Sequence, residues 1–370
     1  MSEPAFRFCD ELGPKTILHC HEPAIGLKAI LVVDNVAAGP AIGGVRMAPD
    51  VTLEECFRLA RAMTFKNAAA GLAHGGGKSV IFADPAMEPA AKERLVRAFA
   101  AAIGPIEDYI AGPDMGTDEV AMAWVRDEIG RSVGLPREIG GIPLDEIGAT
   151  GFGLVAAAEV AAGHAGLALD GARVAVQGFG SVGKHAARFF AEKGAILVGA
   201  SDSRGAIHDP GGLDVAALIA LKDEGGHVVD LPAGEKLAGD ALIGVDCDIW
   251  VPAARPDVIR ADNAAELRAR LVVQGANIGV TEEAEALLAA RGVLSVPDFI
   301  SNAGGVICAA VEYHEGTEAQ AFQTIDEKIR ANTAEVLARA DRDDILPREA
   351  AVDLAGERVR TAMGFRRWKA

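Results

Sequence analysis

The hydrophobic pattern predicts one kind of fold in the first 130 residues. Residues 17–33 contain two apolar runs that predict strands, and Thr52-Leu53-Glu54-Glu55 is a possible capping box that opens a helix. Residues 79–83 predict a short buried strand, and residues 87–103 predict a helix. Residues 108–124 predict a strand, a loop and a second helix. Residues 132–149 are rich in Gly, Pro and Ile without a firm period, which suits a connection between domains.

From Gly151 onward the pattern changes to helices that alternate with strands. A helix that ends near Gly166 precedes the segments RVAVQGFG, HAARFFAEKG, ILVGAS, CDIWVPAA, LVVQGAN, EEAEALLAARG and LSVPDF. This alternation predicts a parallel sheet with helices on both faces. Residues 317–340 and 347–363 predict two amphipathic helices.

Length and composition narrow the class of protein. The chain has 370 residues, which favours two domains over one core, and 50% of them are hydrophobic, which excludes a disordered or fibrous chain. The formal net charge of -17 disfavours nucleic acid or an anionic membrane as the main partner. No apolar run approaches membrane-spanning length, and the first eight residues lack the apolar core of a signal peptide.

The number and spacing of the cysteines indicate the redox compartment of the protein. Five cysteines are scattered without CxxC spacing, which disfavours a disulfide scaffold or a zinc site, so no metal is expected. A reducing cytoplasm is the simplest location.

Two lysines near a glycine run are the first candidates for chemistry. Lys78 follows Gly75-Gly76-Gly77, where the absence of side chains lets backbone approach a ligand closely. Lys66 falls at the edge of a helical stripe, near the end of that helix; its stem alone could be buried, as in a snorkelling lysine. Burial and a neighbouring cation both disfavour a protonated lysine, so the pair suggests amine or carbonyl chemistry. The expected apolar stripe consists of Cys56, Leu59, Met63 and Ala70, with Glu54, Arg58 and Arg61 on the opposite side.

A dinucleotide fingerprint lies in the second half. The apolar strand from Arg173 runs into Gly178-Phe179-Gly180-Ser181-Val182-Gly183, and a helix, Lys184 to Lys193, follows at once. The first glycine makes the tight turn, the second lets pyrophosphate approach the backbone, and the third lets helix and strand pack. The helix N-terminus offers unpaired N–H groups to the phosphate. The alternative is a glycine-rich strand–helix turn that holds no ligand.

An acidic residue after the next strand bears on the choice of cofactor. Asp202 stands about 20 residues beyond the glycines, where a carboxylate accepts hydrogen bonds from the ribose hydroxyls. A carboxylate repels a 2′-phosphate, which favours NAD. Arg204, two residues later, leaves NADP open.

With both halves considered, the chain resembles the Glu/Leu/Phe/Val dehydrogenase family of amino acid dehydrogenases over nearly its whole length. The resemblance is carried by GPAIGGVRM, MTFKNAAAGLAHGGGKSVI, GPDMGT, GATGFG, VAVQGFGSVG, DIWVPAA, QGAN and PDFISNAGGV. It implies an α/β fold: a substrate-binding and oligomerisation domain at 1–148, and a doubly wound Rossmann-type NAD-binding domain at 149–330. The helices of 331–370 are expected to return and pack on the first domain, and a homo-oligomer is expected.

The resemblance also implies the reaction and its residues. An L-amino acid, NAD⁺ and water give a 2-oxo acid, ammonium and NADH. Lys66 would bind the substrate α-carboxylate, Lys78 would activate the water that attacks the imine, and Asp114 would exchange protons with the amino nitrogen. Without the resemblance, Asp114 is more simply a loop aspartate that caps the next helix. The other expected contacts are Gly43, Gly44 and Met63 for the substrate, Asn302 for substrate and cofactor, and Thr150, Ala253, Ala254 and Asn277 for the cofactor.

Two departures from the glutamate branch bear on the substrate. That branch has a lysine at the position of Ile42 and a serine at the position of Ala309, and both contact the side-chain carboxylate of glutamate. Without these groups a buried carboxylate would lack a partner, which costs on the order of several kcal/mol of binding free energy. We therefore expect an apolar substrate, leucine, valine, isoleucine or phenylalanine, unless both residues are ordinary core.

The likeness to individual branches is mixed. The stretch GLKAILVVDNVAAGPAIGGVRM is closer to the leucine branch, whereas ASDSRGAIHDPGGLD and GVICAAVEYHEG are closer to glutamate dehydrogenases. Glutamate thus stays the alternative substrate, and a dinucleotide-binding regulatory protein without turnover is the alternative class.

Overall fold

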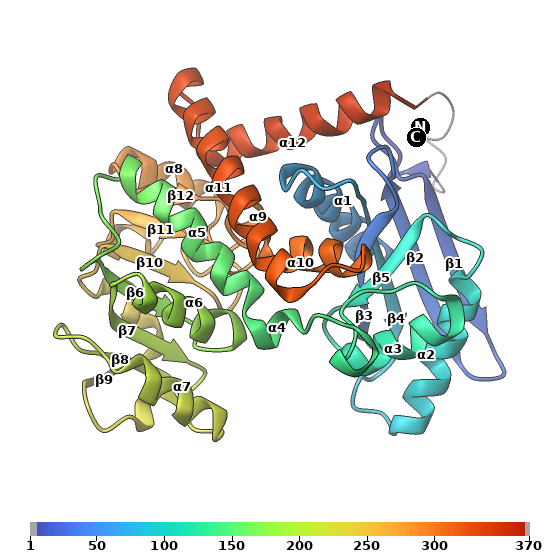
Figure 1. Cartoon of the computed structure of the whole chain (residues 1–370), viewed down its shortest axis with the longest axis horizontal. Helices are drawn as coiled ribbons and strands as arrows, with labels where there is room; N and C mark the ends of the chain where they lie inside the picture. Colours follow the sequence, from blue (N-terminus) through green and yellow to red (C-terminus); the bar gives the residue numbers. More distant parts are fainter. Residues whose placement is uncertain (1–5, 367–370) are drawn as a thin grey trace. The chain divides into compact units, whose positions relative to one another are not determined.

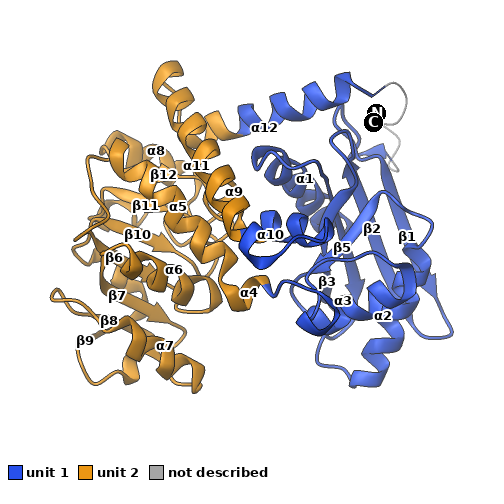
Figure 2. Cartoon of the chain, viewed as in Figure 1, with its two compact units in different colours: residues 1–143, 306–321, 352–370 blue, residues 144–305, 322–351 orange. Residues whose placement is uncertain are grey.

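The computed structural model describes residues 6–366 of the chain (Figure 1). The expectation about a signal peptide falls mainly on residues 1–5, which lie outside the described residues. The chain forms two compact units, which Figure 2 draws in blue and orange. Unit 1 consists of Met1–Pro143, Val306–Ala321 and Val352–Ala370, and unit 2 consists of Leu144–Gly305 and Phe322–Ala351.

Unit 1 contains a five-stranded mixed sheet in the order β1-β2-β4-β3-β5. Its strands are β1 (Thr16–Glu22), β2 (Leu27–Asn35), β3 (Ala41–Ala48), β4 (Gly75–Phe82) and β5 (Tyr109–Pro113). Strand β3 runs parallel to both β4 and β5, whereas β2 is antiparallel to β1 and β4. Helix α1 (Leu53–Ala69) packs on one face of the sheet, and α2 (Pro89–Ile103) and α3 (Glu119–Ile129) pack on the other.

Helix α1 begins where the sequence predicts, but its buried stripe is different. The Thr52 side chain accepts a hydrogen bond from the Glu55 N–H, as in a capping box. The buried positions are Cys56, Ala60, Thr64, Asn67, Ala68 and Ala69. The expected stripe through Leu59 and Met63 is therefore wrong, because small and hydroxyl side chains let the helix lie closer to the sheet. Arg61 is also not on a solvated side, because it is paired with the fully buried Asp34.

Unit 2 contains a seven-stranded sheet in the order β12-β11-β10-β6-β7-β8-β9. Its strands are β6 (Arg173–Gln177), β7 (Ile196–Asp202), β8 (Gly205–His208), β9 (Glu235–Leu237), β10 (Ile249–Pro252), β11 (Leu271–Val273) and β12 (Leu294–Val296). The five strands from β12 to β7 are parallel, and β8 and β9 add an antiparallel edge. The strand order reverses between β6 and β10, which is where α/β sheets of this kind bind ligands.

The helices of unit 2 surround the parallel strands, as the alternating pattern predicts. They are α4 (Leu144–Ile147), α5 (Ala149–His164), α6 (Ser181–Glu192), α7 (Val215–Asp223), α8 (Glu282–Ala290) and α9 (Asp298–Ser301). Helix α5 is buried along most of its length, as its alanine and glycine content allows. Mixed α/β architecture with a doubly wound sheet is thus confirmed.

The last three helices divide between the units differently from the expected boundaries. They are α10 (Gly304–Tyr313), α11 (Glu318–Asp343) and α12 (Pro347–Gly364). Residues 322–351 group with unit 2, whereas we expected residues 331–370 to join the first domain. The reason is visible on α11: Arg330 pairs with Glu159 of α5, and Ile329 lies against Gly153 of the same helix.

Residues 306–321 and 352–370 belong to unit 1, so α10 and α12 each contribute to both units. Among residues 6–366, no helix has both the length and the apolar character that a membrane crossing requires.

Candidate active site

The glycine run before Lys78 forms part of a strand. Gly75, Gly76 and Gly77 all belong to β4. A Cβ on Gly75 would lie 1.7 Å from the carbonyl oxygen of Asn35 in β2, and one on Gly76 would lie 2.0 Å from the backbone nitrogen of Thr64 in α1. The glycines therefore let β2 and α1 pack tightly on β4. This differs from the expected role, in which the glycines open space for a ligand.

Lys78 and Asp114 meet on the face of the sheet that α1 covers. The Nζ atom of Lys78 is in direct contact with the Oδ2 atom of Asp114, which follows β5. Gly44 on β3 makes room for this contact, because a Cβ there would lie 2.7 Å from the Asp114 Cβ and 3.0 Å from its Oδ2. The structure thus brings together two of the expected catalytic residues and one expected substrate-binding glycine.

Arg46 is a third charged member of this group, and the sequence analysis missed it. Its Nη2 lies 3.4 Å from the Asp114 Oδ1, and its Nη1 lies 2.6 Å from the Glu55 Oε1 on α1. Residues 42, 44 and 46 of β3 share one face of the strand, because side chains alternate. That period of two, counted from the expected substrate residue Ile42, is the signal that could have found Arg46. We call Arg46, Glu55, Lys78 and Asp114 the Lys78 cluster.

The environment of Lys78 lowers its pKa to about 7. Burial is the largest cause, since the residue is only 6% exposed, and the positive charge of Arg46 is the next lowering cause. Lys66 contributes in the same direction but less. A second cation near Lys78 was expected, and the larger effect comes from Arg46. A lysine with this pKa is partly neutral at physiological pH and can accept a proton.

The other expected substrate residues also lie in unit 1. Lys66 and Met63 are half-buried on α1, three residues apart and thus on neighbouring turns of one face. Ile42 is 3% exposed and pairs in register with Gly76 of β4, and Ala309 is 7% exposed on α10. The carbonyl of Gly43 accepts a 2.7 Å hydrogen bond from the buried Tyr109 hydroxyl. A Cβ on Gly43 would lie 1.7 Å from the Gly77 carbonyl oxygen, which gives that glycine a packing role.

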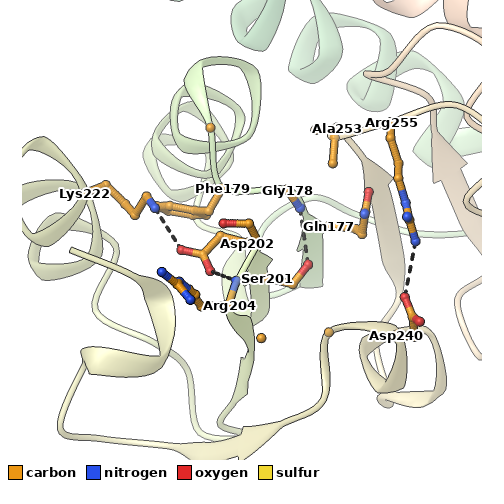
Figure 3. A pocket seen from close by; sticks show the side chains of 15 residues that line it. Gln177, Gly178, Phe179, Ser201, Asp202, Arg204, Lys222, Asp240, Ala253 and Arg255 are labelled. Atoms are coloured by element: carbon orange, nitrogen blue, oxygen red, sulfur yellow. Dashed lines mark hydrogen bonds and ion pairs between the residues drawn. The ribbon is translucent and has the colours of Figure 1, made fainter. Parts of the chain in front are cut away.

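The dinucleotide fingerprint opens onto a cavity of about 780 Å³ in unit 2 (Figure 3). A Cβ on Gly178 would lie 2.5 Å from the Ala254 Cβ, and one on Gly183 would lie 2.0 Å from the Gly178 carbonyl oxygen. A Cβ on Gly180 would meet nothing within 4 Å. The first and third glycines therefore serve packing, and the second lies at an open surface. The cavity is lined by residues 177–180, 201–205, 222, 239, 240 and 253–255.

The N-terminus of α6 borders this cavity without a side-chain cap. Its first residues are Ser181 and Val182, and its N-cap is Gly180. Uncapped N–H groups at a helix N-terminus attract an anion such as a pyrophosphate. Six of the expected cofactor residues line this cavity: Gly178, Phe179, Gly180, Asp202, Ala253 and Ala254.

Asp202 accepts several hydrogen bonds from its own unit (Figure 3). Its Oδ2 accepts from the Lys222 Nζ at 2.8 Å and the Val228 N–H at 3.0 Å, and its Oδ1 accepts from the Arg204 N–H at 2.9 Å. Burial acts to raise the pKa of Asp202, but these hydrogen bonds outweigh it and lower the pKa. Lys222 also lines the cavity, and the sequence analysis did not single it out.

The remaining expected cofactor residues are Asn277, Asn302 and Thr150. Asn277 follows β11, and the Asn302 Nδ2 donates a 2.9 Å hydrogen bond to its Oδ1. Within residues 6–366, the buried Asn302 Oδ1 has no hydrogen-bond partner. Thr150 on α5 lies nearby, since a Cβ on Gly305 would be 3.3 Å from its Oγ1. The Asn302 Oδ1 without a partner, the open surface at Gly180 and the uncapped N-terminus of α6 together fit a dinucleotide with a carboxamide at one end.

Comparisons with known proteins show the family to which the chain belongs. Residues 14–131 match the model "Glu/Leu/Phe/Val dehydrogenase, dimerisation domain", and residues 140–367 match "Glutamate/Leucine/Phenylalanine/Valine dehydrogenase". The glutamate dehydrogenase of Thermotoga maritima is 40% identical over 349 residues, which are 89% of this chain and 83% of that protein. The glutamate dehydrogenase of Aeropyrum pernix is 37% identical and covers 90% of this chain and 85% of its own length.

Solved structures give the same result. The hetero-hexameric glutamate dehydrogenase of Thermus thermophilus, in its Leu-bound form, superposes with a TM-score of 0.84 at 33% identity, covering 94% of this chain and 89% of that one. The L-tryptophan dehydrogenase of Nostoc punctiforme has a TM-score of 0.75 at 26% identity, covering 95% and 98%. Curated relatives include both NAD-specific and NADP-dependent enzymes. The chain therefore belongs to the Glutamate/Leucine/Phenylalanine/Valine dehydrogenase family and is an NAD(P)-dependent amino acid dehydrogenase that acts on CH–NH₂ donors.

Proposed function

We propose that the chain catalyses the reversible oxidative deamination of an apolar L-amino acid, leucine, valine, isoleucine or phenylalanine, with NAD. The choice of an apolar side chain rests on one observation, the pair Ile42 and Ala309. Both are buried apolar residues of unit 1, and neither can donate a hydrogen bond to a side-chain carboxylate. An apolar substrate side chain gains about 25 cal/mol per Å² that it buries.

The residues of unit 1 have chemically complementary roles in this reaction. Lys66 holds the substrate α-carboxylate as a fixed cation. Lys78, neutral in part near pH 7, accepts a proton from the water that attacks the imine carbon. Its contact with Asp114 provides a path for that proton, and Asp114 exchanges protons with the leaving amino group. Arg46 holds the other oxygen of Asp114 and fixes the direction of its carboxylate.

The residues of unit 2 bind and orient the cofactor. The N–H groups at the start of α6 would hold the pyrophosphate, and Asn302, Asn277 and Thr150 would hold the nicotinamide end. These residues would hold NAD⁺, which would supply the hydride acceptor for the substrate Cα. In the overall balance, the protonated amino acid, NAD⁺ and water give the 2-oxo acid, ammonium, NADH and one proton.

Glutamate is the second candidate substrate, and the curated relatives favour it. The proteins at 37–40% identity are named glutamate dehydrogenases. A glutamate side chain needs a cation or a hydroxyl donor in the pocket. The likeness of the N-terminal motifs to the leucine branch stays a prediction.

Substrate preference is tested by the formation of NADH, followed at 340 nm at alkaline pH, with single amino acids. We expect kcat/KM for leucine, valine or phenylalanine to exceed that for glutamate by at least about tenfold. Turnover with glutamate alone would replace the proposal with the second candidate. No NADH with any amino acid would contradict both.

The double variant Ile42→Lys/Ala309→Ser sharpens this test. It introduces a cation and a hydroxyl, so we expect a gain in kcat/KM for glutamate and a loss of about tenfold to a hundredfold for apolar substrates. Unchanged ratios would show that the specificity pocket lies elsewhere.

NAD is the proposed preferred cofactor, with NADP accepted. Asp202 disfavours a 2′-phosphate, whereas Lys222 and the Arg204 side chain offer positive charge beside it. For Asp202→Ala we expect weaker NAD binding and relatively better NADP use, because Lys222 loses its carboxylate partner. For Lys222→Ala we expect the opposite change in the ratio. Equal NADP/NAD ratios in wild type and both variants would show that other residues set the preference.

A homo-oligomer in the cytoplasm completes the proposal. The family model for residues 14–131 is named a dimerisation domain, and the Thermus relative is a hexamer. The five free cysteines, of which Cys9 is exposed, are typical of a reducing compartment. Size-exclusion chromatography with light scattering would test the assembly, and a monomeric mass at micromolar concentration would contradict it.

A further inference from the structure

Arg348, in the first turn of α12, forms three hydrogen bonds inside unit 2. Its Nε donates to the Glu285 Oε2 at 2.7 Å, its Nη1 to the Asp298 Oδ1 at 3.0 Å, and its Nη2 to the Gln274 Oε1 at 3.2 Å. The guanidinium is largely buried, and so are Glu285 and Asp298. A planar fork of donors suits three acceptors at once, which a single ammonium group cannot match.

Two of these acceptors hold the two ends of one short loop: Gln274 begins it, and Asp298 accepts from its last residue, Ile278. Gln274 begins the segment 274–278, which follows β11. Its side-chain Nε2 also donates to Glu285 at 2.8 Å and to Ser295 at 3.1 Å, and its carbonyl accepts from the buried Ser301 hydroxyl at 2.7 Å. The beginning of the loop is therefore held by Arg348 and Glu285, which also contact each other, and by the hydroxyl groups of Ser295 and Ser301.

The end of the loop is held in an unfavourable backbone conformation. Ile278 has a φ of +53°, although its side chain is β-branched and 52% exposed. Its N–H donates to the Asp298 Oδ2 at 2.8 Å, while the other oxygen of that carboxylate accepts from Arg348. Strained positions of this kind persist only where surrounding contacts hold them, and they cluster at functional sites.

Asn277 lies between these two anchors, and its Oδ1 accepts from Asn302. Asn302 directly follows α9, the short helix that supplies both Asp298 and Ser301. In the sheet, β11 lies on the opposite side of β6 from β7, the strand that ends at Asp202. A dinucleotide with its adenosine at Asp202 and its pyrophosphate at α6 would therefore place its nicotinamide toward Asn277 and Asn302.

We propose that Arg348 is a positioning residue for the nicotinamide end of the cofactor, acting through Gln274 and Asp298 on the loop 274–278. The proposal rests on the proposed function, because it assumes a bound nicotinamide dinucleotide. Arg348 itself touches neither cofactor nor substrate. It keeps Asn277 against Asn302, so that the orphaned Asn302 Oδ1 stays available to the carboxamide.

Arg348→Lys tests this role without the loss of positive charge. We expect its NADH dissociation constant, measured by the fluorescence of the bound cofactor, to rise by about tenfold. ADP-ribose, which lacks the nicotinamide, should bind within about twofold of wild type by calorimetry. Arg330→Lys is the matched control, because Arg330 pairs with Glu159 and Asp326 of the same unit and has no bond to the loop. That control should leave both dissociation constants unchanged.

A rescue variant separates positioning from general loss of structure. Glycine adopts a positive φ freely, so Ile278→Gly should relieve the strain that the Arg348 network holds. In the Arg348→Lys background it should restore at least about half of the lost NADH affinity, whereas in the wild type it should change affinity less than about twofold. If Arg348→Lys does not fold, Asp298→Asn, which weakens the same anchor, takes its place with the same expectations.

Each outcome decides the proposal. Loss of NADH affinity with retained ADP-ribose affinity supports it. Equal loss for both ligands, or NADH affinity equal to wild type in a folded Arg348→Lys variant, overturns it. Failure of the proposed function is distinct, because it is measured as a lack of NADH formation from amino acids by the wild type. A wild type that binds neither NADH nor NADPH would overturn both.

Discussion

The Lys78 cluster of unit 1 and the cofactor cavity of unit 2 are built from different parts of the chain. The cluster consists of charged side chains from four segments, namely β3, β4, the end of β5 and α1. The cavity is lined by the glycine turn, residues 177–180, together with residues 201–205 at the end of β7 and residues 253–255 after β10. The cluster has an amine whose pKa is far from its usual value, whereas the carboxylate in the cavity is stabilised in its ionised form.

The difference shows how each unit contributes to the reaction. A proton-transfer group needs a charge state that water would not give it, so it must be buried among other charges. A cofactor needs a surface of fixed shape that donates hydrogen bonds, and backbone provides this without perturbed groups. Substitutions should therefore act through charge in the cluster and through shape in the cavity.

The largest effect is expected for Lys78→Met. Loss of the base should lower kcat by about a thousandfold, because general-base groups contribute about 10²–10⁴. NADH binding should stay within about twofold of wild type, since unit 2 is unchanged. Turnover is measured at 340 nm and binding by fluorescence. Lys15→Met, which removes a surface lysine paired with Asp108, is the control. Wild-type turnover in Lys78→Met would remove this residue from the mechanism.

The second effect compares two glycines of one turn. Gly180→Ala has open space around the new Cβ, so we expect an unchanged melting temperature. The methyl group would overlap the pyrophosphate, and an overlap of about 1–3 kcal/mol weakens NADH binding by about tenfold to a hundredfold. Gly183→Ala should instead destabilise the fold by about 1–3 kcal/mol, since its Cβ meets the Gly178 carbonyl. Thermal unfolding and NADH titration separate them; the same pattern in both variants would contradict the distinction between open and packed glycines.

The third effect concerns the charge of Arg46. Its guanidinium lowers the pKa of Lys78, so Arg46→Gln should raise that pKa. Because the neutral amine is the base, the acid limb of the kcat/KM profile should move to higher pH by about one unit, with about fivefold less activity at pH 7. Activity should recover near pH 9. Arg58→Gln, an exposed change on α1, should leave the profile in place. A profile that loses height without moving would show that Arg46 acts only by orienting Asp114.

The fourth effect is on stability. Lys78 has a pKa of about 7 in the folded chain and about 10.4 when unfolded, so the unfolded chain binds an extra proton between these values. Stability should therefore rise with pH by about 1.4 kcal/mol per unit in this window, and the rise should stop below pH 7. Lys78→Met lacks this dependence. In urea denaturation at pH 7.5, Lys78→Met should have a higher free energy of unfolding than the wild type. This difference should be smaller at pH 9. A constant difference would show that Lys78 titrates normally.

The comparison also explains what could be predicted from sequence. Gly183 packs against Gly178, five positions earlier, so the spacing of the glycines and their flanking strands were enough to locate the cavity; the close approach of Gly178 to Ala254 joins distant segments and was not predicted. Element positions were predictable for the same reason: Thr52, for example, caps α1 through a residue three positions away.

The Lys78 cluster depends on contacts between distant segments, and these were predicted only in part. Lys78 and Asp114 are 36 positions apart and were paired through family resemblance. Arg46 was missed because its partners, Glu55 and Asp114, meet it only across the sheet and α1. Lys222 and Arg348 were missed for the same reason, because each pairs with carboxylates at least 20 positions away. Ala60 and Thr64 were left out of the buried stripe because the closeness of α1 to β4 depends on the glycines of another element.

The chain passes from one unit to the other after residues 143, 305, 321 and 351. These crossings limit how the protein can be divided. A fragment cut at residue 143 would lack Glu312 of α10, whose carboxylate accepts from the backbone N–H groups of Leu135 and Ile142. Truncation just before Val352 would remove Arg358, which donates to the carbonyls that end α1. Neither half is therefore expected to be obtained as a soluble, independently expressed piece, and laboratory recombination with relatives has to exchange all segments of a unit together.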